Sequence, residues 1–281
     1  MASRDEEHEP RTPPPIRDAA RTRWTVHGVE PGQRRAPEET AVALVHDAST
    51  TAVMMATPAD LEDFAVGFSL SEGAIARVED IRDLDVVVQD LGVEVRMWLA
   101  PERALHVASR RRRLAGPTGC GLCGIDSLAE AVRSPRRVAG ETVRVEPAAL
   151  LAAMSALSDA QPLGRETRAM HAAGFWTPTS GLLAVREDVG RHNALDKLIG
   201  ARARAGAAGA AGAAAGVVLL TSRVSVEMVQ KAAVLGAPIL CAVSAPTALA
   251  IRVAEEAGIT LVAVARADGF EVFSHRERVL A

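Results

Sequence analysis

The sequence lacks an excess of either charge, since 32 basic residues nearly balance 35 acidic ones and leave a formal net charge of −3. Proteins that bind double-stranded DNA usually have a basic domain, so this balance argues against that function. Cysteine is scarce, and three residues are too few for a disulfide scaffold. Lysine is scarcer still, because only Lys197 and Lys231 accompany the 30 arginines, a bias that we attribute to codon usage.

Long apolar runs are also missing. One long uncharged run, residues 205–222, begins with Gly and Ala alone, which gain little free energy from lipid. It predicts a flexible connector that leads into a short strand. The first 22 residues mix acids, Pro and Arg without the apolar core of a signal peptide. We therefore expect a cytoplasmic protein that binds neither membrane nor nucleic acid.

The patterning predicts a disordered tail over residues 1–22 and a small α+β domain over residues 23–109. Within this domain, residues 40–46 and 51–57 are expected to form paired strands, and residues 58–70 a helix with one apolar face. Residues 84–89 and 93–99 are expected to form a hairpin. An Arg-rich segment with a connecting helix follows over residues 110–140.

Residues 141–281 are expected to form a second domain in which helices and strands alternate. Predicted strands cover residues 181–185, 217–220, 238–243 and 260–265, and predicted helices cover 192–202, 225–235 and 246–257, after an earlier helix with Leu150, Met154 and Leu157. Alternation of this kind is typical of parallel strands with crossover helices. The expected fold class is α/β, or α+β for the whole chain.

The sharpest local motif is Gly119-Cys120-Gly121-Leu122-Cys123-Gly124. Its glycines leave both sulfurs unhindered, and in a reducing compartment a C-x-x-C pair indicates metal binding, redox exchange or sulfur handling. A structural zinc site needs four ligands, and no second pair stands at zinc-finger spacing. The four arginines at 110–113 would favour the thiolate. A metal site shared between two copies and a purely structural loop stay open; Cys241, in an apolar run, is expected to be a buried hydrophobe.

Polar residues also gather where predicted strands pass into helices. Asp188, Arg191, His192 and Asn193 occupy one such junction, and Arg223 with Ser225 and Ser244 with Thr247 occupy two more. Junctions at the carboxyl ends of strands share one crevice in an open α/β sheet, and helix starts bind anions. Ordinary helix capping is the alternative reading. His171 is either part of this crevice or a core histidine.

Six segments together resemble the FdhD family of formate dehydrogenase accessory sulfurtransferases: TPADLEDFAVGFSLSEG, GCGLCG, REDVGRHNALDKLIG, SRVSVEMVQKA, GAPILCAVSAPTALAIRVAEEAG and ITLVAVAR. They cover most of residues 40–266 in the family's order. The chain departs from the family pattern at Arg168-Ala169-Met170, where the family usually has Thr-Gly-Gly. It also departs over residues 263–266, where the family usually has Gly-Phe-x-Arg and this chain keeps only Arg266.

The resemblance implies a homodimer with a cytidine deaminase-like, three-layer C-terminal domain that needs no metal of its own. It further implies that Cys120 carries a persulfide, with Cys123 as its partner, and passes sulfur from a cysteine desulfurase to the bis-guanine-dinucleotide molybdenum cofactor destined for formate dehydrogenase. The residues expected to hold that cofactor are His171, Asp188, Arg191, His192, Asn193, Arg223, Ser225, Ser244, Thr247, Val264, Ala265, Arg266, Ala267, Asp268 and Gly269. A metal-binding regulator and a cofactor chaperone with dispensable cysteines remain the alternatives.

Overall fold

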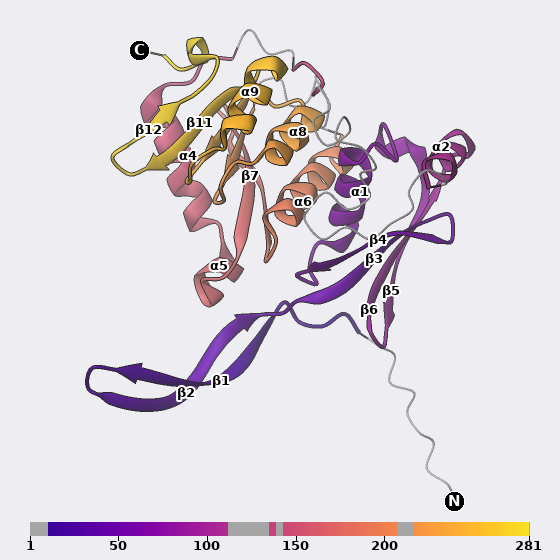
Figure 1. The fold of residues 1–281 in the computed structure, drawn as a ribbon, viewed down its shortest axis with the longest axis horizontal. Helices are drawn as coiled ribbons and strands as arrows, with labels where there is room; N and C mark the ends of the chain where they lie inside the picture. Colours follow the sequence, from indigo (N-terminus) through magenta and orange to yellow (C-terminus); the bar gives the residue numbers. More distant parts are fainter. Residues whose placement is uncertain (1–10, 112–134, 139–142, 207–215, 281) are drawn as a thin grey trace, which may run out of the picture.

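The computed structural model describes residues 11–111, 135–138, 143–206 and 216–280 of the 281-residue chain. Its strands form three separate sheets of two, four and six strands, combined with helices (Figure 1). The α/β class expected from the sequence is therefore confirmed. Among the described helices, none has the length and apolar character needed to cross a membrane.

A long antiparallel hairpin, β1 (Ile16–Thr25) and β2 (Gly28–Pro37), projects from the rest of the molecule (Figure 1). Most of its side chains are exposed, including Trp24 at its tip (79% exposed). The structure thus differs from the expected disordered tail over residues 16–22, which pair with residues 31–37 of β2. Gly28, with φ of 135°, directly follows the two-residue turn of Val26 and His27, in a backbone region that only glycine enters readily.

The N-terminal domain contains the four-stranded sheet, in the order β4-β3-β6-β5. Its elements are β3 (Thr40–His46), β4 (Ser49–Ala56), α1 (Leu61–Ser71), the 3-10 turn η1 (Val78–Asp80), β5 (Ile81–Gln89), β6 (Gly92–Leu99) and α2 (Pro101–Arg111). Both expected strand pairs and the helix are confirmed, and α2 is an additional element. α1 covers one face of the sheet, where Phe64 and Phe68 pack on buried strand residues such as Leu44 and Val95.

The six-stranded sheet has the order β12-β11-β10-β9-β7-β8. The elements of this second domain are α4 (Pro147–Asp159), α5 (Pro162–Thr167), β7 (His171–Thr177), β8 (Gly181–Asp188), α6 (Arg191–Arg204), β9 (Val217–Leu220), α8 (Val226–Leu235), β10 (Ile239–Ala242), α9 (Ala248–Ala257), β11 (Thr260–Arg266), β12 (Gly269–Val272) and the turn η2 (Arg276–Arg278). β9, β10 and β11 are parallel as expected, whereas β7, β8 and β12 run antiparallel to their neighbours.

Helices cover both faces of this sheet and make three layers. One apolar cluster joins α6, α8 and α9 to strand residues such as Val218 and Leu240. Another joins Leu150, Met154 and Leu157 of α4 to the opposite strand face. α1 of the N-terminal domain packs on the outer side of α6, so that α6 connects the two domains (Figure 1).

Candidate functional site

Several polar loops meet at one edge of the six-stranded sheet. β9 and β10 both end there, and the loops that follow them are bonded together, since Val224 N donates to Ala245 O (3.3 Å) and Thr247 N donates to Val224 O (2.9 Å). β11 ends at the same edge, where Val264 N lies 3.4 Å from Ser244 O. We refer to this edge, with residues 221–225, 243–247 and 264–269, as the carboxyl edge.

Two further elements reach the carboxyl edge, because β7 runs antiparallel to β9 and β8 runs antiparallel to β7. β7 begins there, with Ala173 opposite Leu220. β8 ends there, with Asp188 opposite His171, and leads directly into α6. The fold therefore gathers most of the predicted cofactor-binding residues at this edge, namely His171, Arg191, His192, Arg223, Ser225, Ser244, Thr247 and residues 264–269.

Buried polar atoms without a hydrogen-bond partner lie at the starts of α6 and α8. Within the described residues, these atoms include Nε of Arg191, Nε2 of His192 and Oε2 of Glu227. Neither helix start has a side-chain cap, so the first backbone N–H groups are also available. Buried polar groups in proteins nearly always have a partner, and helix starts attract anions. The donors of Arg191 and of the two helix starts therefore indicate an anionic ligand, whereas Oε2 of Glu227 needs a hydrogen-bond donor.

The two histidines of this edge are held neutral. Burial, together with the nearby charges of Arg191 and Lys231, lowers the pKa of His192 to about 4. Burial and Arg191 also lower the pKa of His171. Burial raises the pKa of Glu227, but the side chain of Ser225 and the charge of Arg191 outweigh it, and the net pKa is below the ordinary value. Neutral imidazoles act as hydrogen-bond donors or acceptors, which leaves Arg191 to supply positive charge.

The lowered pKa of His192 makes a testable contribution to pH-dependent stability. The unfolded chain takes up this proton near pH 6.5 and the folded chain only near pH 4, so stability is complete above pH 6.5 and is lost as the pH falls. Between pH 7.5 and 5 the expected loss is about 1–2 kcal/mol. His192→Gln should remove this part of the loss in urea unfolding measured at both pH values. The same change at exposed His27 is the control, and an equal effect there would contradict the assignment.

Two of the predicted ligand residues turn away from the edge. Asp188 is fully buried and forms an ion pair with Lys197, with 2.6 Å between Oδ2 and Nζ. It also accepts hydrogen bonds from Thr57 N (3.0 Å) and Gly190 N (2.8 Å). Asn193 donates to Asp188 Oδ1 (3.0 Å) and to a backbone oxygen of β4. These side chains hold the turn that presents Arg191 and His192, rather than facing a ligand.

Thr247 and Val264 have special local roles. Thr247 caps α9, since its Oγ1 accepts from Ala250 N (3.2 Å), which is the capping alternative raised by the sequence. Val264 has φ of 53°, a conformation that is costly for a β-branched residue, at an irregularity in the pairing of β11 with β12. Backbone strain of this kind is concentrated at functional sites. Ala265 is buried, whereas Arg266, Ala267 and Asp268 are exposed.

The cysteines fall into two groups. Cys120 and Cys123 lie outside the described residues. Cys241 is fully buried in β10, and burial raises the pKa of its thiol to about 12. The expectation of an inert core residue is therefore confirmed. Among the described residues, no group of three His, Cys, Asp or Glu side chains is placed to hold a metal ion.

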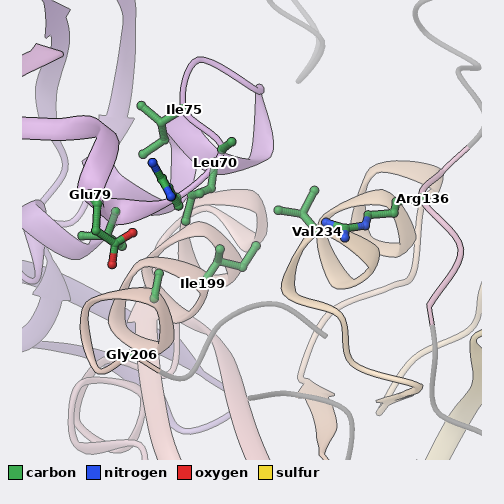
Figure 2. A pocket seen from close by; sticks show the side chains of 11 residues that line it. Leu70, Ile75, Glu79, Arg136, Ile199, Gly206 and Val234 are labelled. Carbon is green, nitrogen blue, oxygen red and sulfur yellow. The ribbon is translucent and has the colours of Figure 1, made fainter. Parts of the chain in front are cut away.

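A cavity of about 350 Å³ lies toward the C-terminal ends of α6 and α8, whereas both helices begin at the carboxyl edge. Figure 2 shows the residues that line it. The cavity is lined by Ile199 of α6, by Gly206 just beyond that helix, by Leu70 and by Val234 near the end of α8. Arg136, the second described residue after the segment with Cys120 and Cys123, also lines the cavity. Arg136 therefore lies at the end of α6 and α8 that is remote from Arg191 and His192.

The sequence analysis missed Glu227 and Lys231 as neighbours of this site. Both lie on one side of α8, in the segment SRVSVEMVQKA, and both influence His192. The sequence signal for these neighbours was a pair of charged residues in a largely apolar helix. Burying a charge is costly unless it has a partner, so each of these residues predicts a nearby polar group. Lys231 has that partner in Asp196, at 2.7 Å.

Comparison with known proteins gives a consistent result. A model of the FdhD/NarQ family matches residues 37–280. The "Sulfur carrier protein FdhD" of Agrobacterium fabrum is 53% identical over 89% of this chain and 90% of its own length, and that of Brucella abortus biovar 1 is 49% identical over 94% and 97%. A solved structure from Desulfotalea psychrophila, described as a formate dehydrogenase accessory protein, superposes with a TM-score of 0.75 at 25% identity, over 95% of this chain and all of that one.

Proposed function

This chain belongs to the FdhD/NarQ family, and from that premise we propose that it is a sulfur carrier that serves formate dehydrogenase. The observation that carries the proposal is its 45–53% identity, over most of its length, to relatives named sulfur carrier protein FdhD. The finer proposal is that Cys120 accepts sulfur from a cysteine desulfurase and delivers it to the molybdenum cofactor of formate dehydrogenase. The working protein is proposed to be a cytoplasmic homodimer whose C-terminal domain has a cytidine deaminase-like fold.

The first step is persulfide transfer. The Cys120 thiolate attacks the outer sulfur of the desulfurase persulfide, the sulfur–sulfur bond of that persulfide breaks, and the desulfurase cysteine leaves as a thiolate. The product is Cys120–S–SH, a reversible state of cysteine. Cys241 does not compete, because its burial and raised pKa keep it protonated and inaccessible.

The substrate that receives the sulfur carries nucleotide pyrophosphates. Arg191 and the uncapped starts of α6 and α8 would hold these phosphates, while His171 and His192 would supply neutral hydrogen bonds. Arg223, Ser225 and Ser244 would contribute from neighbouring loops. Asp188 and Asn193 act indirectly, since they fix the turn before α6. The fit rests on the unpartnered buried atoms of Arg191 and His192.

Two roles for Cys123 lead to different products. In one, its thiolate attacks the inner sulfur of Cys120–S–SH, hydrosulfide leaves, and a Cys120–Cys123 disulfide remains for a cellular dithiol to reduce. In the other, Cys123 shields the persulfide and both thiols are free after delivery. Intact mass after turnover distinguishes the roles, because the disulfide product is lighter by two hydrogens.

The assignment of Cys120 is tested by loading the full chain with a desulfurase and cysteine and weighing it intact. One added sulfur, about 32 Da, is expected on the wild-type chain and on Cys241→Ala, and none on Cys120→Ala. Cys241→Ala is the matched control because it removes a thiol that is buried. Full labelling of Cys120→Ala would overturn the proposal.

A further inference from the structure

A second positively charged site lies between the hairpin and α5. A groove of about 570 Å³ separates β1 and β2 from the end of that helix, and four arginines line it: Arg21, Arg23, Arg34 and Arg168. Small-molecule sites in proteins have volumes of about 300–1,000 Å³. The groove therefore has a size suited to a small ligand.

The pairing of the hairpin gathers this charge on one side. Arg21 and Arg23 lie two positions apart in β1, so their side chains project from the same face of the hairpin. Arg34 stands opposite Ala19, which places its side chain on that face too. The other face carries Trp24 opposite Val29. The hairpin thus has a basic face and a more apolar face.

Backbone contacts position the basic face against α5. Arg34 donates from Nη2 to the backbone oxygen of Thr167 (3.1 Å), and Arg21 donates from Nε to that of Gln33 (3.4 Å). Arg168 follows α5 with φ of 55°, a left-handed conformation that directs the chain from the helix into β7. Arginines from separate elements are thereby held around one space.

The positive charge of the groove is hardly balanced by acidic side chains in its lining. Among the described residues, Glu166 is the one carboxylate that lines the groove, and it forms an ion pair with Arg35 at 2.9 Å. Arginine stays protonated at all physiological pH values, so the four guanidinium groups repel one another. An anion in the groove would relieve this repulsion.

We propose that this groove binds the phosphate groups of a small phosphorylated ligand. A guanidinium group donates paired hydrogen bonds that match phosphate geometry, and a terminal phosphate has three acceptor oxygens, whereas a carboxylate has two. Several arginines can therefore share one phosphate. Arg168 lies three residues before His171, so the groove opens within about 11 Å of the carboxyl edge along the chain. The proposal does not depend on sulfur transfer.

Titration calorimetry with inorganic triphosphate tests this site on the full chain at low ionic strength. The variant Arg191→Gln serves as the background, so that binding at the carboxyl edge is weakened in every sample. In that background, Arg21→Gln with Arg23→Gln should weaken triphosphate binding roughly tenfold or more. Arg168→Asn, which tolerates the left-handed conformation, should weaken it independently. The control, Arg137→Gln with Arg276→Gln, removes the same charge at exposed positions elsewhere and should stay within about twofold.

Three results would overturn the proposal. The first is unchanged binding in both groove variants, and the second is an equal loss in the control, which would reflect only the general field of the protein. The third is tighter binding of a glutamate-decamer peptide that triphosphate does not displace, which would assign the groove to an acidic segment of a partner. The hairpin residues are exposed, so melting temperatures should be unchanged; if the double variant nevertheless fails to fold, Arg168→Asn alone decides.

Discussion

Replacing Gly67 with alanine should destabilise the protein by about 3 kcal/mol or more. A Cβ atom at Gly67 in α1 would lie 1.7 Å from the backbone oxygen of Asp196 in α6. A Cβ atom at Gly200 in α6 would lie 1.8 Å from the backbone oxygen of Asp63 in α1. Both obstacles are backbone atoms within helices, so the two helices would have to separate. Gly200→Ala should therefore have a similar effect, measured by urea unfolding.

The sign of this effect distinguishes packing from helix propensity. Alanine stabilises a helix interior by about 1 kcal/mol relative to glycine, so propensity alone predicts that both variants become more stable. Gly32→Ala in the hairpin is the matched control, because its Cβ would meet only the flexible end of Arg21, at 3.5 Å, and its stability should hardly change. Unchanged or increased stability in Gly67→Ala would mean that the crossing of α1 and α6 is not as close as described.

This crossing matters for the site because of what each helix carries. α1 belongs to the N-terminal domain, while α6 begins with Arg191 and His192 at the carboxyl edge. Close contact at Gly67 and Gly200 fixes the position of α6 against a second domain. Ser71 strengthens the contact, since its hydroxyl donates to Asp196 (2.7 Å), which also binds Lys231. The orientation of the edge residues thus depends on residues far away in the sequence.

Periodicity predicted most of the regular structure of this chain. The strands β3, β4, β6, β9, β10 and β11 and the helices α1, α6, α8 and α9 lie close to their expected positions. β7 was missed because it is buried on both faces and contains small residues, so no alternation of polar and apolar residues marks it. Its Gly174 faces Leu157 so closely that a Cβ would lie 2.8 Å from that side chain. The antiparallel part of the sheet was therefore not predicted, although β8 was expected as a strand over residues 181–185.

The hairpin was missed for a different reason. Its composition is rich in Arg and Pro and poor in the residues that usually mark strands, which is also the signature of disorder. What orders it is the complete register between β1 and β2, together with the bond from Arg34 to Thr167, more than 130 positions away. A long-range contact of this kind leaves no local signal in the sequence.

The site itself was predicted in part. Motifs at the ends of strands correctly located the carboxyl edge, because the rule that places these ends together depends only on topology. Residue type could not distinguish a side chain that faces a ligand from one that supports the turn. Asp188 and Asn193 turn inward because Thr57 and Met55 of the other domain are there to bind them. Such partners become visible only in the folded chain.

Replacing Lys197 with methionine should cost about 3–5 kcal/mol in the free energy of unfolding. Lys197 and Asp188 are both fully buried, and Nζ also donates to the backbone oxygen of Thr57 (2.9 Å). Methionine keeps the length of the side chain but leaves the Asp188 carboxylate without its counter-charge in the interior. Urea unfolding at pH 7.5 measures the loss. The two lysines of the chain, Lys197 and Lys231, both occupy such buried ion pairs.

Arg204→Met provides the matched control on the same helix. Arg204 pairs with Asp63 and Glu62 but is 42% exposed, so removing its charge should cost no more than about 1 kcal/mol. Adding Asp188→Asn to Lys197→Met should recover part of the loss, because it removes the unpaired carboxylate and leaves an amide oxygen that can still accept from Gly190. Equal losses in Lys197→Met and Arg204→Met would contradict this account. Burial, rather than the presence of an ion pair, is what makes the charge of Lys197 essential.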